Sequence, residues 1–347
     1  MERASVTDAN IIGLDLAKRV FQAHGARADG SVVFRRKLTR QQVLTFFSKQ
    51  PRCIVAMEAC ATAHDWGRAL QALGHEVRLV PPAYVKPFVK RQKNDAADAE
   101  AIAEAAARPT MRFVTVKSEE QQARAMVFRT RDLLVRQRTQ LINALRGHLA
   151  EHGVVAPQGT TKVKLLSDVI EDVNTTLQPL VVELGRLYID QIAALDGKIA
   201  DLEKMLKREA ARGETTSRLQ TMPGIGPITA MAIETFAPPM ESFRRGRDFA
   251  AWLGLVPIQH STGGKQVLGR TSKMGQRDIR RLLIIGAMAV VKTAGRKNAP
   301  EGSWLARILA RKPRMLAAIA LANKMARSAW AMLTKGEDFR VPVATAS

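Results

Sequence analysis

The sequence predicts an α/β N-terminal domain, then long helices, then a basic and mostly helical C-terminal domain. Three observations predict this arrangement. Short apolar strand patterns alternate with helical patterns over residues 1–115. Residues 116–212 carry long helical patterns instead. From residue 241 onward, twenty Lys and Arg stand against six Asp and Glu, so the last region, 213–347, is strongly basic.

The composition indicates a folded protein with a polyanionic partner. The 347 residues are 46% hydrophobic and 25% charged, with a net charge of +22. Such a charge is tolerated best beside a polyanion, and nucleic acid is the leading candidate. Cys53 and Cys60 lack zinc-ligand spacing and fit a reducing cytoplasm. We find no signal peptide and no segment suited to a membrane span, so we expect a cytoplasmic protein without a membrane partner.

The first region predicts three strands, then alternating helices and strands. The Asp29-Gly30 pair is a hairpin signal between the second and third strands. Thr39 is the expected N-cap of the first helix, and Asn94 that of the last, alanine-rich helix. The expected strands are 10–16, 19–26, 31–38, 53–58 and 76–80, and the expected helices are 39–49, 64–73 and 95–107.

Four carboxylates occupy special places in this pattern. Asp15 ends the first strand, Glu58 ends the fourth, and Asp95 and Asp98 share one face of the last helix. The element order is that of an RNase H-like domain, in which the first and fourth strands are neighbours and the last helix packs near their ends. The four acids would then converge.

Converging carboxylates predict a divalent metal site. Their hard oxygens suit Mg²⁺ or Mn²⁺. Two such ions ~4 Å apart can stabilise the attacking and leaving oxygens of a phosphodiester transfer. The alternative for any single acid is an exposed strand end or a helix N-terminal charge.

The middle region predicts two long helical stretches separated by a linker at 153–162. The first covers residues 119–152. The second carries apolar residues at heptad-like spacing, namely Tyr188, Ile192, Leu195, Ile199, Leu202 and Leu206. Two interpretations remain open: a coiled-coil arm that joins protomers, or an amphipathic helix packed on its own chain.

The last region contains a turn and a polar loop. Residues 223–226 resemble a helix-hairpin-helix turn, in which Gly224 and Gly226 would let backbone N–H groups approach a DNA phosphate. The alternative is a plain turn between helices. Residues 260–265 (HSTGGK) read as a flexible loop in which a serine could be a nucleophile, or as an ordinary surface turn. The expected phosphate-binding cations in and after it are Lys265, Arg270, Lys273, Arg277, Arg280 and Arg281.

The segments IIGLDLAK, VAMEAC and KNDAADAEAIAE resemble the DEDD transposases of bacterial insertion sequences, a family that includes Piv-type DNA invertases and bridge-RNA-guided recombinases. Its four acidic positions match Asp15, Glu58, Asp95 and Asp98, and Lys93 and Asn94 match their usual setting. The resemblance implies a RuvC-like first domain. It covers nearly the whole chain, because GLVP, STGG and GRTSKMG match the second-domain pattern.

The resemblance implies that Ser261, and not its neighbour Thr262, attacks the scissile phosphate, with the acidic site of a partner chain completing the pocket. It also implies cutting and rejoining of DNA at insertion-sequence ends and targets, a guide RNA, and a homodimer or tetramer. Two alternatives remain: a Holliday-junction-type nuclease that uses water and metals alone, and a non-catalytic DNA-binding accessory protein.

Overall fold

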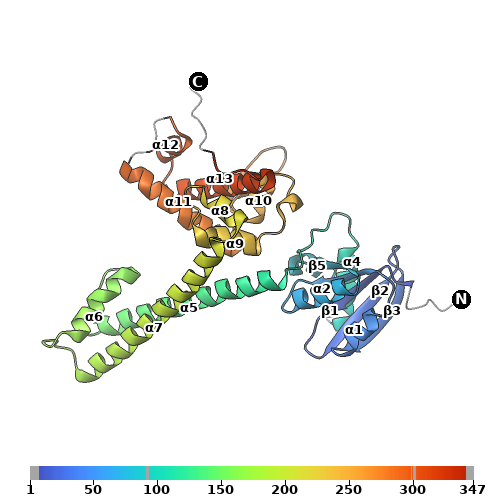
Figure 1. Ribbon diagram of the computed structural model, residues 1–347, viewed down its shortest axis with the longest axis horizontal. Helices are drawn as coiled ribbons and strands as arrows, with labels where there is room; N and C mark the ends of the chain where they lie inside the picture. The colour runs from blue at the N-terminus through green and yellow to red at the C-terminus, as the bar shows by residue number, and fades with distance from the viewer. Residues whose placement is uncertain (1–7, 91–93, 298, 300–301, 341–347) are drawn as a thin grey trace. The chain divides into compact units, whose positions relative to one another are not determined.

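The computed structural model describes residues 8–90, 94–297, 299 and 302–340, and the chain forms two compact units, residues 1–122 and 123–347 (Figure 1). The first unit is built on a five-stranded mixed sheet of order β3-β2-β1-β4-β5. The strands are β1 (Ile11–Asp15), β2 (Val20–Ala26), β3 (Val32–Thr39), β4 (Ile54–Glu58) and β5 (Glu76–Val80). All five predicted strands are confirmed to within two residues. The first and fourth are parallel neighbours, with Leu14 opposite Met57.

Helices cover both faces of this sheet. They are α1 (Gln42–Phe47), α2 (Ala63–Ala72), the short α3 (Pro82–Val85), and α4 (Asp95–Ala106), with a 3₁₀ turn, η2 (Lys86–Phe88), that the sequence did not predict. Ile12 and Leu14 pack with the side chains of α1 and α2. Ile11 packs on the other face with α4. Because side chains alternate along a strand, Asp15 lies on the α4 face.

One predicted helix cap is wrong and one is confirmed. Thr39 stays in β3, paired with Val20, so α1 starts later, after Gln41. Asn94 caps α4 as expected, and its Oδ1 accepts a hydrogen bond from the Ala97 backbone at 2.8 Å.

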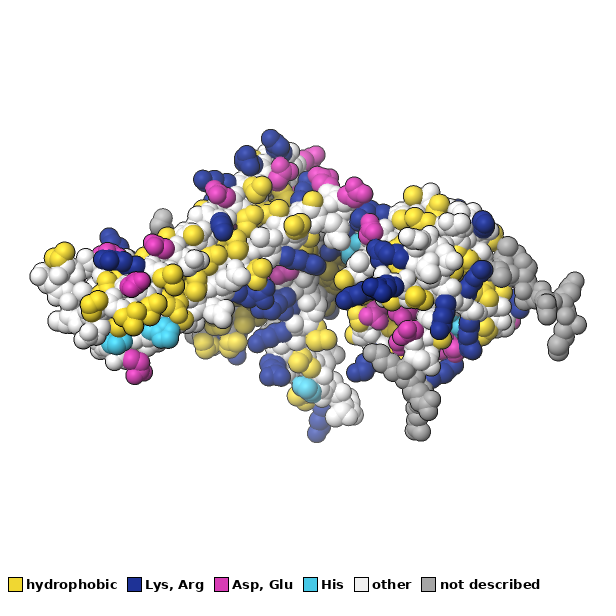
Figure 2. Space-filling view, turned by 90° about the horizontal axis from the view of Figure 1, so that it is seen from below, with side chains coloured by type: hydrophobic (Ala, Val, Ile, Leu, Met, Phe, Trp, Pro, Cys, Tyr) yellow, Lys and Arg dark blue, Asp and Glu magenta, His cyan; other side chains and the backbone are white. Residues whose placement is uncertain are grey.

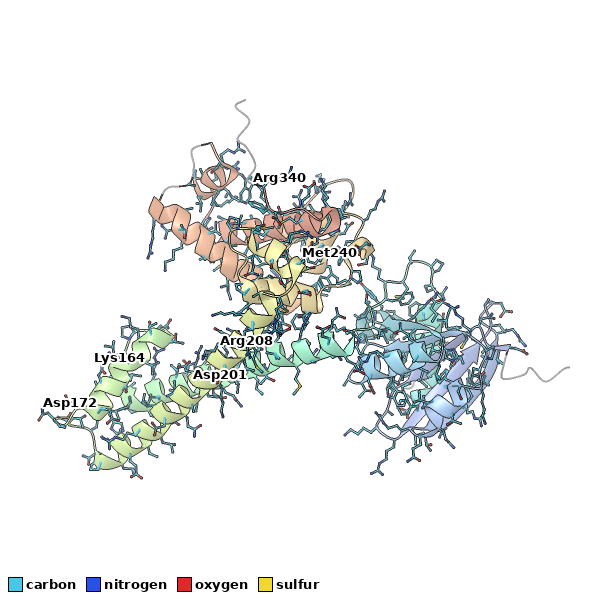
Figure 3. The ribbon with its side chains drawn as sticks, viewed as in Figure 1. Lys164, Asp172, Asp201, Arg208, Met240 and Arg340 are labelled. Atoms are coloured by element: carbon cyan, nitrogen blue, oxygen red, sulfur yellow. The ribbon has the colours of Figure 1, made fainter. Side chains whose placement is uncertain are left out.

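Two long antiparallel helices dominate the start of the second unit. They are α5 (Glu119–Ala150, which begins at the end of the first unit) and α7 (Pro179–Ala210), and between them lie η3 (Thr160–Lys162) and α6 (Val163–Glu171). The Arg131 Nε donates to a Glu203 oxygen at 3.0 Å, and Arg138 pairs with Asp196 nearer the far end. Figure 3 labels Lys164 on α6, Asp172 just after it, and Asp201 and Arg208 along α7.

The heptad-spaced stripe of α7 is covered by this chain itself. Ile192 is buried in a cluster with Ile142, Leu145 and Leu149 of α5 and two α6 side chains. Leu206 joins the C-terminal core, together with Ala125 and Phe128. The stripe therefore packs within the chain, and the helices of the arm share a core with the C-terminal region.

The C-terminal region is mostly helical with one small two-stranded sheet. Its elements are α8 (Glu214–Gln220), α9 (Pro227–Phe236), η4 (Met240–Ser242), α10 (Gly246–Trp252), β6 (Pro257–Gln259), β7 (Leu268–Thr271), α11 (Arg277–Lys297), α12 (Trp304–Leu309) and α13 (Arg314–Lys335). Lys and Arg side chains are spread over the surface of both units (Figure 2). Within the described ranges, none of the helices combines the length and hydropathy that a bilayer crossing requires.

Candidate active site

Gly13 sets how closely α4 approaches the sheet. A Cβ atom at this position would lie 2.1 Å from the Ala99 carbonyl oxygen and 2.9 Å from the Ala103 Cβ, so only glycine fits. The small side chains of α4 complete the contact from the other side. The helix therefore lies directly on β1, and its first turn lies beside the end of that strand.

Three of the four predicted acids come together at this point. One carboxylate oxygen each from Asp15, Asp95 and Asp98 lies within 4.8 Å of the other two. The N-cap of Asn94 fixes the first turn of α4, and the three-residue spacing puts Asp95 and Asp98 on one side of it. Asp15 and Asp98 are half-buried, whereas Asp95 is exposed.

Glu58 lies beside this group but is not part of it. It ends β4, next to Asp15 on the neighbouring strand, and is half-buried. Partial burial and the charge of Glu58 raise the pKa of the Cys60 thiol, with a smaller contribution from Asp15. The two carboxylates thus act on the same thiol. Lys93 lies outside the described residues.

The three clustered carboxylates fit a divalent cation. Anionic oxygens this close repel one another, and a bound cation would relieve that repulsion. Their hard oxygens match the ligand preference of Mg²⁺ and Mn²⁺, and three protein ligands are fewer than the six that such an ion takes.

Ser261 lies in the connection between β6 and β7, and we call residues 257–271, the two strands with this connection, the ribbon. Strands β6 and β7 pair with Pro257 opposite Thr271. Gly263 and Gly264 have φ values of +53° and +78°, the positive pair that a tight two-residue hairpin turn needs, and Thr262 bridges to Lys265. Residues 260–265 thus contain the surface turn that was the alternative to a flexible loop, closed by two adjacent glycines.

The ribbon orders the serine hydroxyl and its neighbour. The Ser261 Oγ is exposed and accepts a hydrogen bond from the Val267 backbone at 3.3 Å. The His260 backbone donates to the Val267 carbonyl at 2.8 Å. The His260 ring lies over Gly269, where a Cβ atom would come within 2.8 Å of it.

The predicted phosphate-binding cations separate into two groups. Four of them are exposed and form no ion pair with a described carboxylate: Lys265, Arg270, Lys273 and Arg277. The Arg280 guanidinium instead donates to the carbonyls of Leu253 and Met274, both at 2.9 Å. Burial, helped by the charge of Arg277, lowers the pKa of Arg280. Arg281 pairs with Asp132 at 2.7 Å.

The turn between α8 and α9 uses its two glycines differently. Gly224 has φ +90°, and its carbonyl oxygen would lie 1.9 Å from a Cβ atom at Gly286 of α11. Its role is therefore close packing inside the unit. Gly226 is exposed at the start of α9, and no atom lies within 4 Å of its Cβ position. Of the two glycines, only Gly226 thus has a backbone that a ligand could approach.

Known transposase families match both the segment with the four acids and the segment with Ser261. Residues 12–153, which hold the four acids, match a family model described as a transposase, and residues 216–300, which hold the ribbon, match the model of the transposase IS116/IS110/IS902 family. A probable family 20 transposase of Pseudomonas aeruginosa is 48% identical over 95% of this chain and 98% of its own length. The chain belongs to the IS110 family of transposases.

Two further relatives of this transposase are named for insertion sequences. The transposase for IS1328 of Yersinia enterocolitica is 40% identical over 96% of this chain and 99% of its own. The transposase for IS1111A of Coxiella burnetii is 39% identical over 97% of this chain and 93% of its own. Transposases cleave and rejoin DNA, so this chain is an enzyme with a DNA substrate.

Proposed function

We propose that this transposase moves an insertion sequence by a metal-assisted transfer in which Ser261 is the nucleophile. The single observation that carries the proposal is the convergence of Asp15, Asp95 and Asp98 beside β1. The strand order of the sheet and the place of α4 also support an RNase H-like domain. We assign Glu58, at the end of the neighbouring strand, as the fourth ligand.

The acids would hold Mg²⁺ or Mn²⁺, which would supply stabilisation of negative charge on the phosphate oxygens. The Ser261 oxygen would form a bond to phosphorus while the bond from phosphorus to one sugar oxygen breaks. The serine proton would pass through solvent to the departing sugar oxygen. Attack on this phosphoserine link by a sugar hydroxyl of another strand would rejoin DNA and restore the serine.

The exposed cations of the ribbon segment would hold the backbone on both sides of the scissile phosphate. Lys265, Arg270, Lys273 and Arg277 are exposed and form no ion pair with a described carboxylate, and Gly226 would offer its backbone N–H. We assign a structural role to Arg280 and Arg281, because both guanidinium groups already bind groups of their own unit.

The test is a transposition assay with labelled DNA ends. We expect Asp15→Asn, Asp98→Asn and Ser261→Ala each to lower strand transfer at least a hundredfold, since each removes a group that acts on the reacting phosphate. Glu104→Gln on α4 is the matched control for the acids, and Thr262→Ala for the serine, and both should stay within threefold of wild type.

A covalent protein–DNA band should form with wild type and be absent with Ser261→Ala. Cleavage that persists in Ser261→Ala would contradict the serine mechanism and support a metal-dependent junction nuclease. Full activity of Asp15→Asn would contradict the metal site and support an accessory DNA-binding role.

A guide RNA and at least a dimer complete the proposal. The charge of +22 is large enough to serve two polyanions. We assign the dimer contact to a second copy bound at exposed leucines of α7, because Leu180, Leu184 and Leu187 share one helix face and are 64%, 51% and 59% exposed. Copurified RNA and the mass of a Leu184→Glu variant in solution test these two assignments.

A further inference from the structure

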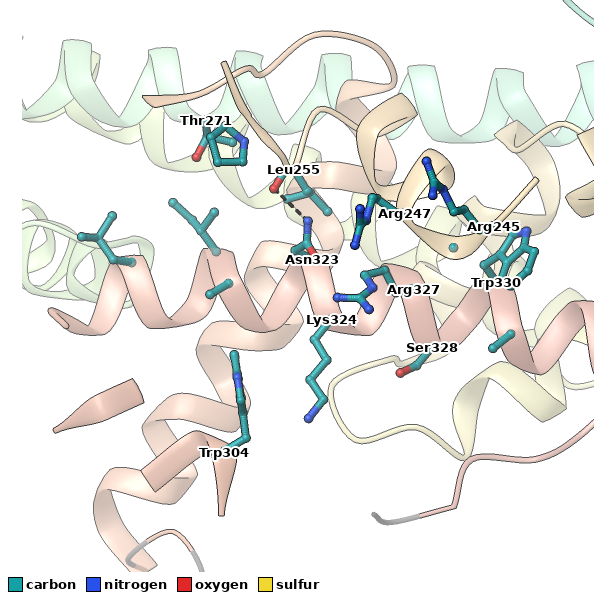
Figure 4. Close-up of a pocket in the computed structure, with 16 residues that line it drawn as sticks. Arg245, Arg247, Leu255, Thr271, Trp304, Asn323, Lys324, Arg327, Ser328 and Trp330 are labelled. Atoms are coloured by element: carbon teal, nitrogen blue, oxygen red, sulfur yellow. Dashed lines mark hydrogen bonds between the residues drawn. The ribbon is translucent and has the colours of Figure 1, made fainter. Parts of the chain in front are cut away.

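A cationic groove of about 970 Å³ opens on the second unit, apart from the residues assigned above. It lies between the start of α10, the base of the ribbon, α12 and α13. Figure 4 shows its main polar and aromatic side chains: Arg245, Arg247, Trp304, Lys324, Arg327 and Trp330.

A glycine brings the arginines of this groove together. A Cβ atom at Gly246 would lie 2.9 Å from the Arg327 carbonyl oxygen, so the start of α10 is pressed against α13. The residues on either side of this glycine, Arg245 and Arg247, are therefore held close to Arg327. Lys324 precedes Arg327 by about one turn of α13 and lines the same groove.

The positive charge of the groove is almost uncompensated. Among the described residues that line it, none is Asp or Glu. Arg245 pairs with Asp248 at 3.5 Å, whereas Arg247, Lys324 and Arg327 form no ion pair with a described carboxylate. Several positive charges that line one concave surface attract a ligand with several negative charges.

Most of the remaining lining residues are apolar or aromatic, which indicates what kind of polyanion the groove would bind. The Lys324 ammonium lies 4.9 Å from the centre of the Trp304 ring, and Trp330 is fixed by its indole N–H on the Met240 carbonyl at 3.1 Å. Leu255 and Ile319 are among the apolar lining residues. An unpaired strand offers bases to apolar and aromatic surfaces and phosphates to cations, whereas a duplex hides its bases.

The groove continues to the base of the serine ribbon. Pro257 and Thr271, which pair with each other where β6 and β7 begin and end, both line it. The Asn323 amide of α13 donates to the Leu255 carbonyl at 3.1 Å and ties the groove to the segment that leads into β6. A strand in the groove would thus lie next to the element that carries Ser261.

We infer that this groove binds an unpaired stretch of nucleic acid, with phosphates on Arg247, Lys324 and Arg327 and a base stacked on Trp304. The inference rests on the proposed function only where it assumes that Ser261 in the ribbon is the nucleophile. DNA and RNA strands share the chemistry that the groove recognises, and the binding test includes both.

The test measures binding of fluorescent dT20, U20 and a 20-base-pair duplex to the full chain by anisotropy at several salt concentrations. Arg247→Gln combined with Arg327→Gln should weaken single-strand binding at least tenfold and reduce the salt slope by about 1.4, which is two phosphates at about 0.7 each. Duplex affinity should change less than threefold. Lys198→Gln combined with Lys207→Gln, two exposed lysines of α7, is the charge-matched control.

A second variant separates stacking from charge. Trp304→Ala should weaken single-strand binding at least fivefold without changing the salt slope, and Trp304→Phe should restore most of it. Preference for dT20 or for U20 would identify the strand as DNA or RNA. Thermal unfolding of every variant checks that the unit is folded.

Three outcomes would overturn the inference. If the variants lose equal affinity for single strands and for the duplex, the groove contributes only general electrostatic attraction. If their single-strand affinity is unchanged, the groove is not a binding site for an unpaired strand. Displacement by polyglutamate, without an effect of the variants on oligonucleotides, would point to an acidic protein partner. Strand transfer by wild type and its loss in Asp15→Asn are scored separately, so failure of the groove leaves the proposed function standing.

Discussion

His24 is a buried titratable side chain in the middle of the sheet. It lies on β2 opposite Gly13, is only 3% exposed, and its Nδ1 has no hydrogen-bond partner among the described residues. Burial lowers the pKa of His24. Glu100 opposes this shift, whereas Arg35 and Lys90 add to it. The folded sheet therefore favours the neutral form of the imidazole.

We expect His24 to make the first unit less stable in mild acid. Below a pH of about 6.5 the unfolded chain binds a proton at this residue, whereas the folded chain does so only at a lower pH, so the free energy of unfolding falls as the pH falls. The slope for one such proton is at most ~1.4 kcal/mol per pH unit. Urea unfolding at pH 7.5, 6.5 and 5.5 measures it.

The matched variant is His24→Leu, which keeps the volume and removes the titration. Its stability relative to wild type should improve as the pH falls from 7.5 to 5.5. Parallel stability curves for the two proteins would show that His24 does not contribute to the acid sensitivity.

At the scale of elements, the contact between Gly224 and Gly286 joins the α8–α9 turn to α11. The Gly224 carbonyl occupies the space that a Cβ atom at Gly286 would need, at 1.9 Å. We predict that Gly286→Ala destabilises the second unit by about 2–3 kcal/mol, because neither backbone can yield. Urea unfolding checks this value.

Gly197 in α7 is the matched helical glycine. No atom lies within 4 Å of its Cβ position, so Gly197→Ala should stabilise the same unit by ~0.5–1 kcal/mol. Effects of the same sign in both variants would contradict the packing argument.

The sequence predicts the elements of the first unit well because its strands and helices follow local periodicity. The first-to-fourth strand pairing and the Asn94 cap are confirmed. Local signals fail where a tertiary contact decides: pairing with β2 keeps Thr39 in the sheet, so it does not cap the first helix. The heptad pattern of α7 could not reveal whether its apolar face packs on the same chain or on a second copy.

The site is predictable to the same extent. Asp15, Asp95 and Asp98 were found from element order, whereas the position of Glu58 outside their group depends on side-chain geometry. The groove of Arg247 and Arg327 was missed, because its members are about eighty positions apart and converge only through the contact at Gly246. The cluster of arginines at residues 244–247 was the available signal.

At the scale of the whole molecule, the net charge of +22 should make nucleic-acid binding strongly salt-dependent. Four exposed cations of the ribbon segment on duplex phosphates predict a slope of log affinity against log salt of about −3 or steeper. Lys265→Gln combined with Lys273→Gln should make that slope shallower by about 2. Filter binding to a nonspecific duplex at salt concentrations from about 50 to about 200 mM measures the slope.

The lysine pair of α7 again serves as the control, since Lys198→Gln with Lys207→Gln removes equal charge from the arm. A slope unchanged by the ribbon variant, or shifted equally by both, would mean that the ribbon is not the main duplex contact.

The seating of α4 on Gly13 has a mechanical consequence. Asp95 and Asp98 are carried by one rigid rod of twelve residues, ~18 Å long at the usual helical rise. The backbones of the two residues move as one, so a tilt of the helix shifts both at once. A force applied to its distal end, near Arg108, would be transmitted along its length to Asp95 and Asp98.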